Sequence, residues 1–470
     1  MDFPRCLVLL WQTATALIEK TALQIRIAGS HDAEDWRFGD STEVGGRATL
    51  IGIEKKVNPT YNAVVRHCPS SRVGMQPNQN PARVNRYVPA LEGIRGYGLL
   101  LIFCAHYFLP FQLADRGTFR YTLFSSLSSL AIFALPGFFV VSGFLIGGIL
   151  YHTRNREGFF RIFYGRRILR IFPVYYVTLL AIYIFLKTHG IVANYRFWVH
   201  FLYIQNLLPG YTALKSGPVG MLHFWSLAME EQFYILWPLV VWLFPEKKKL
   251  LKIAIGLILC SFVLRAAAPL VTAVPDQYAY FTPTCVSPIL LGVVLSLLHG
   301  GKVYQRFEWM GKWIVVGGAS AVMVLTAWKG REWASTFWGE EIIALLTGIL
   351  GVALVVAIQE KNSLLQRLFS VRWVCWLGGL SYSAYVFHLV FAPFFFHVVS
   401  VRLSMYMRPH LAVIASGAIA FCLTIVLSLL SRVCIEGPAM VLKGKLRYGA
   451  ERSRETAPKS PEELIPSAVS

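Results

Sequence analysis

The sequence predicts an all-α fold, a polytopic transmembrane helical bundle of about ten spans. Of its 470 residues, 55% are hydrophobic and only 15% are charged, whereas soluble proteins carry about a quarter charged residues. Apolar segments long enough to cross a bilayer recur regularly from Leu91 onward. The net charge of +20 does not predict nucleic-acid binding, because Lys and Arg collect in the cytoplasmic loops of membrane proteins.

A transmembrane helix needs about 20 predominantly apolar residues, and ten segments approach or exceed that length. The predicted spans are residues 94–113, 123–150, 168–187, 223–244, 250–270, 284–299, 312–328, 341–358, 374–398 and 411–431. The apolar segment 197–208 is too short to cross, so we predict an interfacial or re-entrant segment there.

Composition divides the chain into three regions. Residues 1–86 are mixed and polar, and we expect a weakly structured extension or an over-called start, with Met75 as an alternative start. Residues 87–440 form the predicted membrane domain. Residues 441–470 are polar with Pro and Ser, which predicts a disordered tail.

Lys and Arg gather on one set of loops, with five Arg between residues 154 and 167 and four Lys between 247 and 252. The loops between these hold fewer, and residues 271–283 hold none. The positive-inside rule therefore predicts that both termini are cytoplasmic. Eight cysteines are scattered singly without CxxC spacing, so no metal site is expected.

Ionisable residues inside a membrane helix are costly and indicate function. Arg95 and His106 are eleven residues apart, which puts them on one helix face and about 16 Å apart along the axis. Glu230 lies at a depth similar to that of His106, so the two could pair. A carboxylate raises the basicity of an imidazole, as a general base for a hydroxyl requires. The alternative is a pair that only joins two helices.

Further polar groups accompany these three. Ser226 and Tyr234 flank Glu230 in the sequence, and Ser381, Tyr385 and His388 follow i, i+4, i+7 and form one stripe. Small hydroxyl residues in membrane helices also serve helix packing, which is the alternative for the serines. Glu231 points about 100° away from Glu230 and is left out of the predicted site.

The run GRRILRIFPVYY places Arg166, Arg167 and Arg170 at the predicted cytoplasmic end of the third span. A plain positive-inside anchor is one explanation. The other is binding of a cytosolic molecule with phosphates, for which Arg offers bidentate contacts. Arg95 at the same face favours the second explanation.

These motifs, taken together, resemble the membrane-bound acyltransferase 3 family. The matching segments are ALEGIRGYGLLLIFCAH, FFVVSGFLIG, RRILRIFPVYY, HFWSLAMEEQFYILWP, GGLSYSAYVFH and CIEGPAM, which together span about residues 87–440. The family's Arg-x10-His pair falls on Arg95 and His106, and its SLxxEEQFY motif runs from Ser226 to Tyr234. Glu92 stands where the family usually has Asp, and Leu135-Pro136-Gly137 stands where many members carry Val-Asp.

The resemblance implies an O-acyltransferase that moves an acyl group, commonly acetyl, from acyl-CoA to a hydroxyl of a sugar or glycan. It implies no permanently bound cofactor, and it favours the inner membrane of a bacterium. The expected catalytic residues are His106, Glu230 and Arg95, and the expected donor-binding residues are Arg166, Arg167 and Arg170. Residues expected to support the site or bind the acceptor are Glu92, Ser226, Tyr234, Ser381, Tyr385 and His388.

Two other functions fit the polar residues. A proton-coupled transporter or export protein could use His106, Glu230 and His388 as a proton relay. Transporters often contain internal repeats, and the two halves of this sequence show none. A membrane scaffold without catalytic activity is the other alternative, but it gives no reason for a buried His and Glu at matched depth.

Overall fold

The computed structural model describes residues 89–108, 118, 129–208, 218–271, 280–329, 337–360 and 363–449. The chain divides into two units, residues 1–73 and 74–470. The first unit, the predicted boundary at residue 86 and residues 450–470 of the predicted tail lie outside the described residues. Within the described ranges the second unit contains helices and no strand, so the all-α prediction is confirmed.

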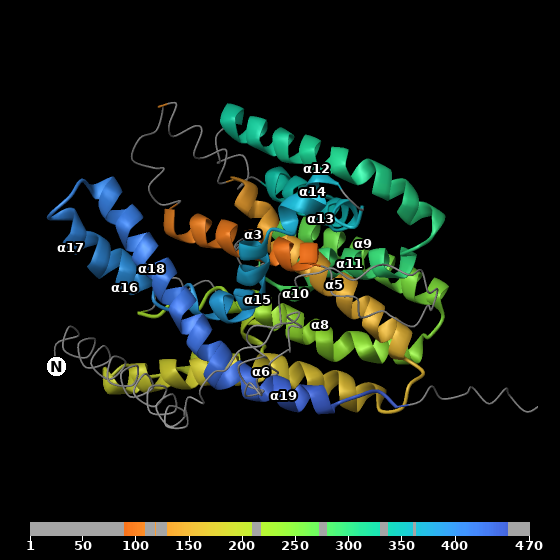
Figure 1. Ribbon diagram of the computed structural model, residues 1–470, viewed down its shortest axis with the longest axis horizontal. Coiled ribbons are helices and arrows are strands. Elements are labelled where there is room, and N and C mark those ends of the chain that lie inside the picture. Colours follow the sequence, from red (N-terminus) through yellow and green to blue (C-terminus); the bar gives the residue numbers. More distant parts are fainter. Residues whose placement is uncertain are drawn as a thin grey trace, which may run out of the picture. The chain divides into compact units, whose positions relative to one another are not determined.

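Each predicted span contains a helix (Figure 1). These helices are α3 (Pro89–Phe108), α5 (Ala134–Thr153), α6 (Phe159–Thr188), α8 (Phe224–Leu243), α9 (Lys247–Val271), α11 (Ser287–Leu298), α12 (Lys302–Lys329), α13 (Phe337–Ala357), α15 (Arg372–Phe387) and α18 (Pro409–Ser431). The shorter elements are η2 (Leu130–Phe133), α7 (Tyr195–Trp198), η3 (Val199–Leu202), η4 (Gln205–Leu207), α10 (Thr282–Cys285), α14 (Leu364–Phe369), α16 (Ala392–Phe394), η8 (Phe395–Val399), α17 (Ser400–Ser404), η9 (Arg432–Glu436) and α19 (Gly437–Lys445).

The count of ten spans is not confirmed. Among the described residues, five helices are long and apolar enough to cross a membrane, and a bent pair, Arg372–Phe387 with Ala392–Ser404, raises the number to six. The predicted span 374–398 is thus broken, with an angle of 76° between its two parts. Helix α11 has only 12 residues, fewer than a straight span needs. Helices α3 and α8 carry charged residues that line the candidate site described below, Arg95 on α3 and Glu230 and Glu231 on α8.

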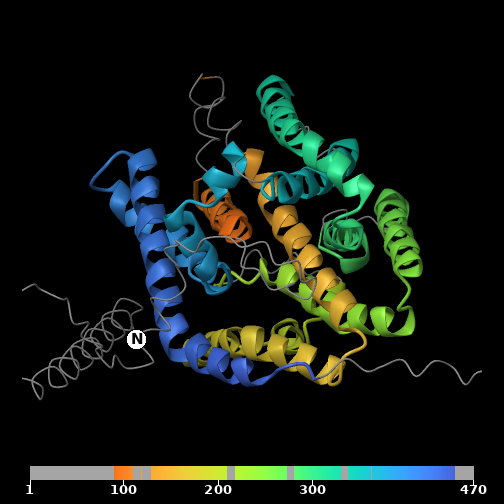
Figure 2. The same cartoon turned by 45° about the vertical axis from the view of Figure 1, so that its right-hand side comes forward.

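The last described helix runs past residue 440, the predicted end of the membrane domain. Helix α18 continues through η9 into α19, which ends at Lys445, and α19 lies alongside α6 in two views (Figures 1 and 2). The Arg166 guanidinium donates to the Leu446 carbonyl from Nε at 2.9 Å and from Nη2 at 2.6 Å. Residues at the start of the predicted tail therefore contact α6.

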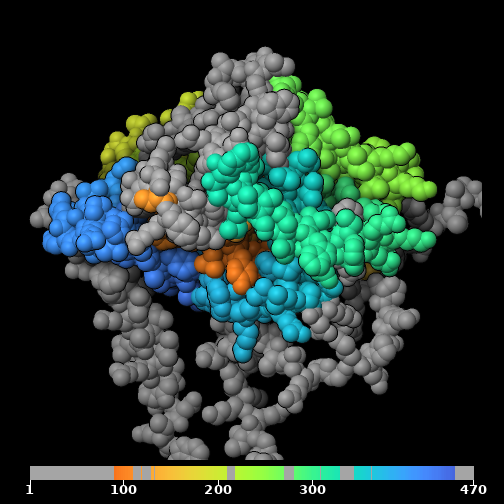
Figure 3. All heavy atoms as spheres, turned by 90° about the horizontal axis from the view of Figure 1, so that it is seen from above, coloured from red at the N-terminus to blue at the C-terminus, as the bar shows by residue number. Residues whose placement is uncertain are grey.

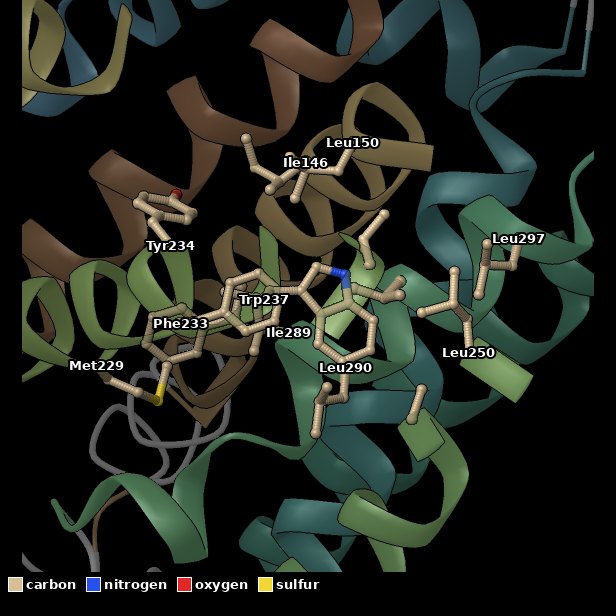
Figure 4. Packing of buried hydrophobic residues seen from close by; sticks show 14 of the residues in the cluster. Ile146, Leu150, Met229, Phe233, Tyr234, Trp237, Leu250, Ile289, Leu290 and Leu297 are labelled. Carbon is tan, nitrogen blue, oxygen red and sulfur yellow. The ribbon is translucent and has the colours of Figure 1, made fainter. Parts of the chain in front are cut away.

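The largest hydrophobic cluster lies where α8 meets α5, α9 and α11. Phe233 and Trp237 stack with ring centroids 5.6 Å apart, and Figure 4 shows both beside Ile289 and Leu290 of α11. This packing fixes the rotation of α8 about its axis. It therefore determines where the polar residues of the same helix point.

Glycine lets α3 and α15 approach closely, which brings Arg95 to the polar stripe of α15. A Cβ at Gly378 would collide with the Glu92 carbonyl. In the space-filling view the orange atoms of α3 lie against cyan atoms from the region of α14 and α15 (Figure 3). The SGFLIGG motif packs in the same way, since a Cβ at Gly143 would collide with the Ile289 carbonyl.

We expect Gly378→Ala to lower the thermal unfolding midpoint of the purified protein, because the α3–α15 contact leaves no room for a methyl group. Overpacking of this kind costs about 1–3 kcal/mol. The matched control is Gly256→Ala in α9, where a Cβ would meet nothing within 4 Å and alanine favours the helix. Equal midpoints for the two variants would contradict the close approach.

Candidate active site

A cavity of about 90 Å³ lies among α3, α5, α6, α8 and α15. Its polar lining comes from five separate stretches of the chain: Arg95, Ser142, Arg167, Arg170, Ser226, Glu230, Glu231, Tyr234, Ser381, Tyr382 and Tyr385. Eight of these were predicted as site residues from the sequence. Four predicted residues, His106, Glu92, Arg166 and His388, do not line the cavity.

The arginines outnumber the carboxylates in this cavity by three to two. Arg167 lies 5.2 Å from the centroid of the Tyr234 ring, close enough for a cation–π contact. Arg95 pairs with Glu92 at 3.3 Å one turn away, so Glu92 holds Arg95 from outside the cavity. The excess of guanidinium groups suits an anionic ligand such as a phosphate.

Glu230 is held inside the cavity. The Ser142 and Tyr234 hydroxyls lie beside its carboxylate as hydrogen-bond partners, and the positive charges acting on it are those of Arg95 and Arg167. Ser142 and Tyr234 also hydrogen-bond each other. No hydrogen bond or ion pair joins Glu230 to His106 within the described ranges, so the structure does not bring the predicted pair together.

The three consecutive polar residues of the EEQ motif, Glu230, Glu231 and Gln232, have different surroundings. Glu230 faces the arginines, and Glu231, which is only 5% exposed, lines the same cavity. Glu231, which we left out of the predicted site, therefore lines the cavity together with Glu230. Gln232 instead donates to the Tyr203 carbonyl at 2.6 Å and to Asn206 Oδ1 at 2.9 Å, which attaches α8 to the end of η3 and to η4. The prediction that segment 197–208 is too short to cross agrees with these elements.

The direct partner of His106 is His388. His106 lies in the last turn of α3 with an exposed side chain, and its Nδ1 is 3.3 Å from His388 Nε2. His388 is fully buried at the C-terminal end of α15, where the bent pair breaks. Its Nδ1 is 2.6 Å from the Tyr385 carbonyl, and the Tyr107 hydroxyl donates to the His388 carbonyl at 2.6 Å.

These contacts determine which ring nitrogens carry protons. The Tyr385 carbonyl can only accept, so His388 Nδ1 carries hydrogen, and Nε2 of neutral His388 is an acceptor. His106 must then donate from Nδ1, which leaves the lone pair on His106 Nε2. A base that accepts a proton from a hydroxyl needs this tautomer.

Tyr385 connects the histidine pair to the cavity. Its side chain lines the cavity, and its hydroxyl hydrogen-bonds Ser226 Oγ at 2.6 Å and the His223 carbonyl at 3.1 Å. The His223 ring lies 4.9 Å from the His388 ring, and His223 Nε2 donates to the Val386 carbonyl at 3.0 Å. The stripe predicted on α15 is therefore present. Ser381 and Tyr385 line the cavity, and His388 contacts His106.

Arg166 does not accompany Arg167 and Arg170. Its guanidinium binds the Leu446 carbonyl and lies 5.6 Å from the Tyr448 ring centroid. Successive helix residues point about 100° apart, so Arg166 faces α19 while Arg167 and Arg170 face the cavity. Sequence reasoning missed Ser142, Tyr382 and His223 as well as Glu231. Helical periodicity could have separated Arg166 from the other two arginines.

The family model of the acyltransferase domain matches residues 88–433. The chain belongs to the acyltransferase 3 family. The resemblance drawn from the motifs is confirmed, and with it the classification of the chain as an acyltransferase. Together with the apolar helices, the family assignment makes this a membrane protein.

The curated relatives are bacterial O-acetyltransferases by name. A peptidoglycan O-acetyltransferase of Listeria monocytogenes is 28% identical over 323 residues, covering 64% of this chain and 49% of that protein. A candidate peptidoglycan O-acetyltransferase of Bacillus subtilis is 25% identical over 325 residues, covering 65% and 48%. A candidate O-acetyltransferase of Staphylococcus aureus is 26% identical over 329 residues, covering 66% and 51%. The chain spans about half the length of these relatives. No solved structure matches it.

Proposed function

We propose that this protein is an O-acetyltransferase that transfers an acetyl group from acetyl-CoA to a hydroxyl of a cell-surface polysaccharide of the peptidoglycan type. The observation that carries the proposal is the arrangement along α3. Arg95 lies in the arginine-lined cavity, and His106, with its free Nε2, lies eleven residues further, about 16 Å along the axis. An extended pantetheine arm is of comparable length.

In the proposed reaction His106 is the general base. His106 Nε2 takes the proton of the acceptor hydroxyl as the hydroxyl oxygen bonds to the thioester carbonyl carbon. The carbon–sulfur bond then breaks, and the CoA thiolate leaves and takes up the proton from His106 Nε2. His388 holds His106 in the tautomer that can accept this proton, so His388 is a positioning residue.

The arginines of the cavity would bind the phosphates of acyl-CoA. Arg167 and Arg170 lie on one face of α6, and Arg95 approaches from α3. Glu230, predicted to orient His106, instead orients the arginines in this proposal, because Arg95, Arg167, Ser142 and Tyr234 surround its carboxylate. Glu230 would then contribute to catalysis by helping to position acyl-CoA rather than by orienting His106.

We expect Arg167→Gln to raise the KM for acetyl-CoA on the order of 10- to 100-fold, because a charge-assisted hydrogen bond contributes about 1.5–3 kcal/mol. Arg167→Lys keeps the charge and loses the bidentate geometry, so its effect should be intermediate. Lys302→Gln removes a positive charge at the exposed start of α12 and serves as the control. An unchanged KM in Arg167→Gln would exclude donor binding at this arginine.

A further inference from the structure

A second cavity, of about 520 Å³, lies away from the candidate active site. It is formed where α5 ends, α6 begins and α8 ends, on the side of the loops predicted to be cytoplasmic. Its lining includes three arginines and three aromatic rings: Arg154, Arg156, Arg161, Phe159, Phe160 and Trp242. Gly158 makes the turn between α5 and α6 with φ of +72°, a conformation that favours glycine.

The cavity concentrates positive charge that no acidic group of the described residues balances. No carboxylate is among its described lining residues, and Glu157, next to it in the sequence, lies against Gly449 instead. Arg154 contacts the Tyr151 ring and carbonyl, and its buried Nε has no hydrogen-bond partner in the described ranges. The side chains of Arg156 and Arg161 form no hydrogen bond or ion pair with the described part of the chain.

The start of α6 adds to this positive potential. Helix α6 has 30 residues, its N-cap Gly158 provides no side-chain cap, and its first turn contains no acidic residue. The free backbone N–H groups of that turn belong to Phe159, Phe160 and Arg161, all of which line the cavity. An uncapped helix N-terminus attracts anions, so backbone and side chains favour the same ligand charge.

An exposed apolar stripe on α8 ends at this cavity. Its members are Ile235, Leu236, Leu239, Trp242 and Leu243, each between 42% and 61% exposed. They follow helical spacing and share one face. Trp242 belongs to both the stripe and the cavity, and its ring centroid lies 5.9 Å from that of Phe160. A ligand that fills both would carry an anionic group and a long apolar chain.

We propose that this cavity binds the phosphate of an anionic glycerophospholipid, with its acyl chains lying along the α8 stripe. Basic residues at a membrane boundary attract anionic lipids in this way. The phosphate would contact the guanidinium groups of Arg156 and Arg161 and the free N–H groups of α6. The site is separate from the one proposed for acyl-CoA and does not depend on the proposed reaction.

The test measures binding of long-chain phosphatidylglycerol and of phosphatidylcholine to the delipidated full-length protein in detergent, by native mass spectrometry. The variant Arg156→Gln/Arg161→Gln is compared with Lys248→Gln/Lys252→Gln, which removes the same charge from α9 on the same side. We expect the arginine variant to weaken phosphatidylglycerol binding on the order of 10- to 100-fold and the lysine variant to change it less than twofold.

Three results would overturn the proposal. One is an equal loss in the two double variants, which would indicate a bulk charge effect. Another is equal binding of phosphatidylcholine, which would exclude recognition of a net negative headgroup. The third is displacement of phosphatidylglycerol by free CoA or inorganic phosphate as effectively as by excess lipid, which would assign the cavity to a soluble phosphate. Size-exclusion profiles matching that of the wild type establish that each variant is folded.

Discussion

Replacing His106 by alanine is expected to reduce acceptor-dependent release of CoA from acetyl-CoA by about 10²- to 10⁴-fold, the usual contribution of a general base. The reason is specific to the proposed geometry. His106 Nε2 carries the lone pair, and its side chain is exposed at the end of α3. No other ring nitrogen of the His106–His388 pair is both unprotonated and free to accept a proton.

The measurement compares membranes containing the wild type and His106→Ala, each with and without a peptidoglycan acceptor. His410→Gln, a histidine change at the exposed start of α18, is the matched control and should behave as the wild type. Release that persists in His106→Ala at an equal protein level would exclude His106 as the base. Absence of thioester consumption by the wild type, with any acceptor, would favour the proton-coupled transporter instead.

The polar cavity also explains how charged residues can lie within the predicted spans. Charged side chains inside a bilayer are costly unless they face the bundle interior. Glu231 is 5% exposed and lines a cavity that also holds Arg167 and Arg170. Each carboxylate thus lies near guanidinium groups, and α8 presents its apolar stripe to the outside. One face of α8 therefore lines the polar cavity, and another face of the same helix is apolar and exposed.

Helical periodicity predicted much of this arrangement. A helix overlaps every predicted span, and the stripe of Ser381, Tyr385 and His388 on α15 follows from spacing alone. Helical periodicity did not predict that Glu231 lines the cavity, because the cavity extends around α8. Two residues that point 100° apart on a helix can both face a cavity when several helices surround it. The sequence does not reveal how wide such a cavity is.

The partner of His106 could not be predicted for a different reason. Residues 374–398 are mostly apolar and carry no Asp, Glu, Lys or Arg, so they read as one span. Pro393 is a local signal for an interruption, but it does not show that the helix ends at Phe387 and bends by 76° before Ala392. His388 lies at this break, where its ring reaches the end of α3. Depth matching suggested Glu230, because depth along the membrane normal does not determine the lateral position of a helix.

His388→Leu is the second change with a large expected effect, a fall in kcat on the order of 100-fold with the KM for acetyl-CoA unchanged. Leucine fills a similar volume but removes the acceptor that keeps hydrogen on His106 Nδ1. The His106 ring then keeps only its backbone contact with Ile102, so it can rotate or place hydrogen on Nε2, where it cannot serve as a base. In the Ser–His–Asp triad, a residue that imposes the wrong tautomer costs about 10⁴-fold, which sets an upper bound.

The matched variant is His388→Gln, because its amide can donate to the Tyr385 carbonyl and offer an oxygen to His106. Under the tautomer argument, glutamine restores at least a tenth of wild-type kcat while leucine does not. If His388 served only for packing, kcat of the glutamine variant would be equal to or lower than that of the leucine variant. The reason is that position 388 is fully buried and an amide is harder to bury than leucine. Comparing the two rates therefore separates control of the His106 proton from simple packing at the end of α15.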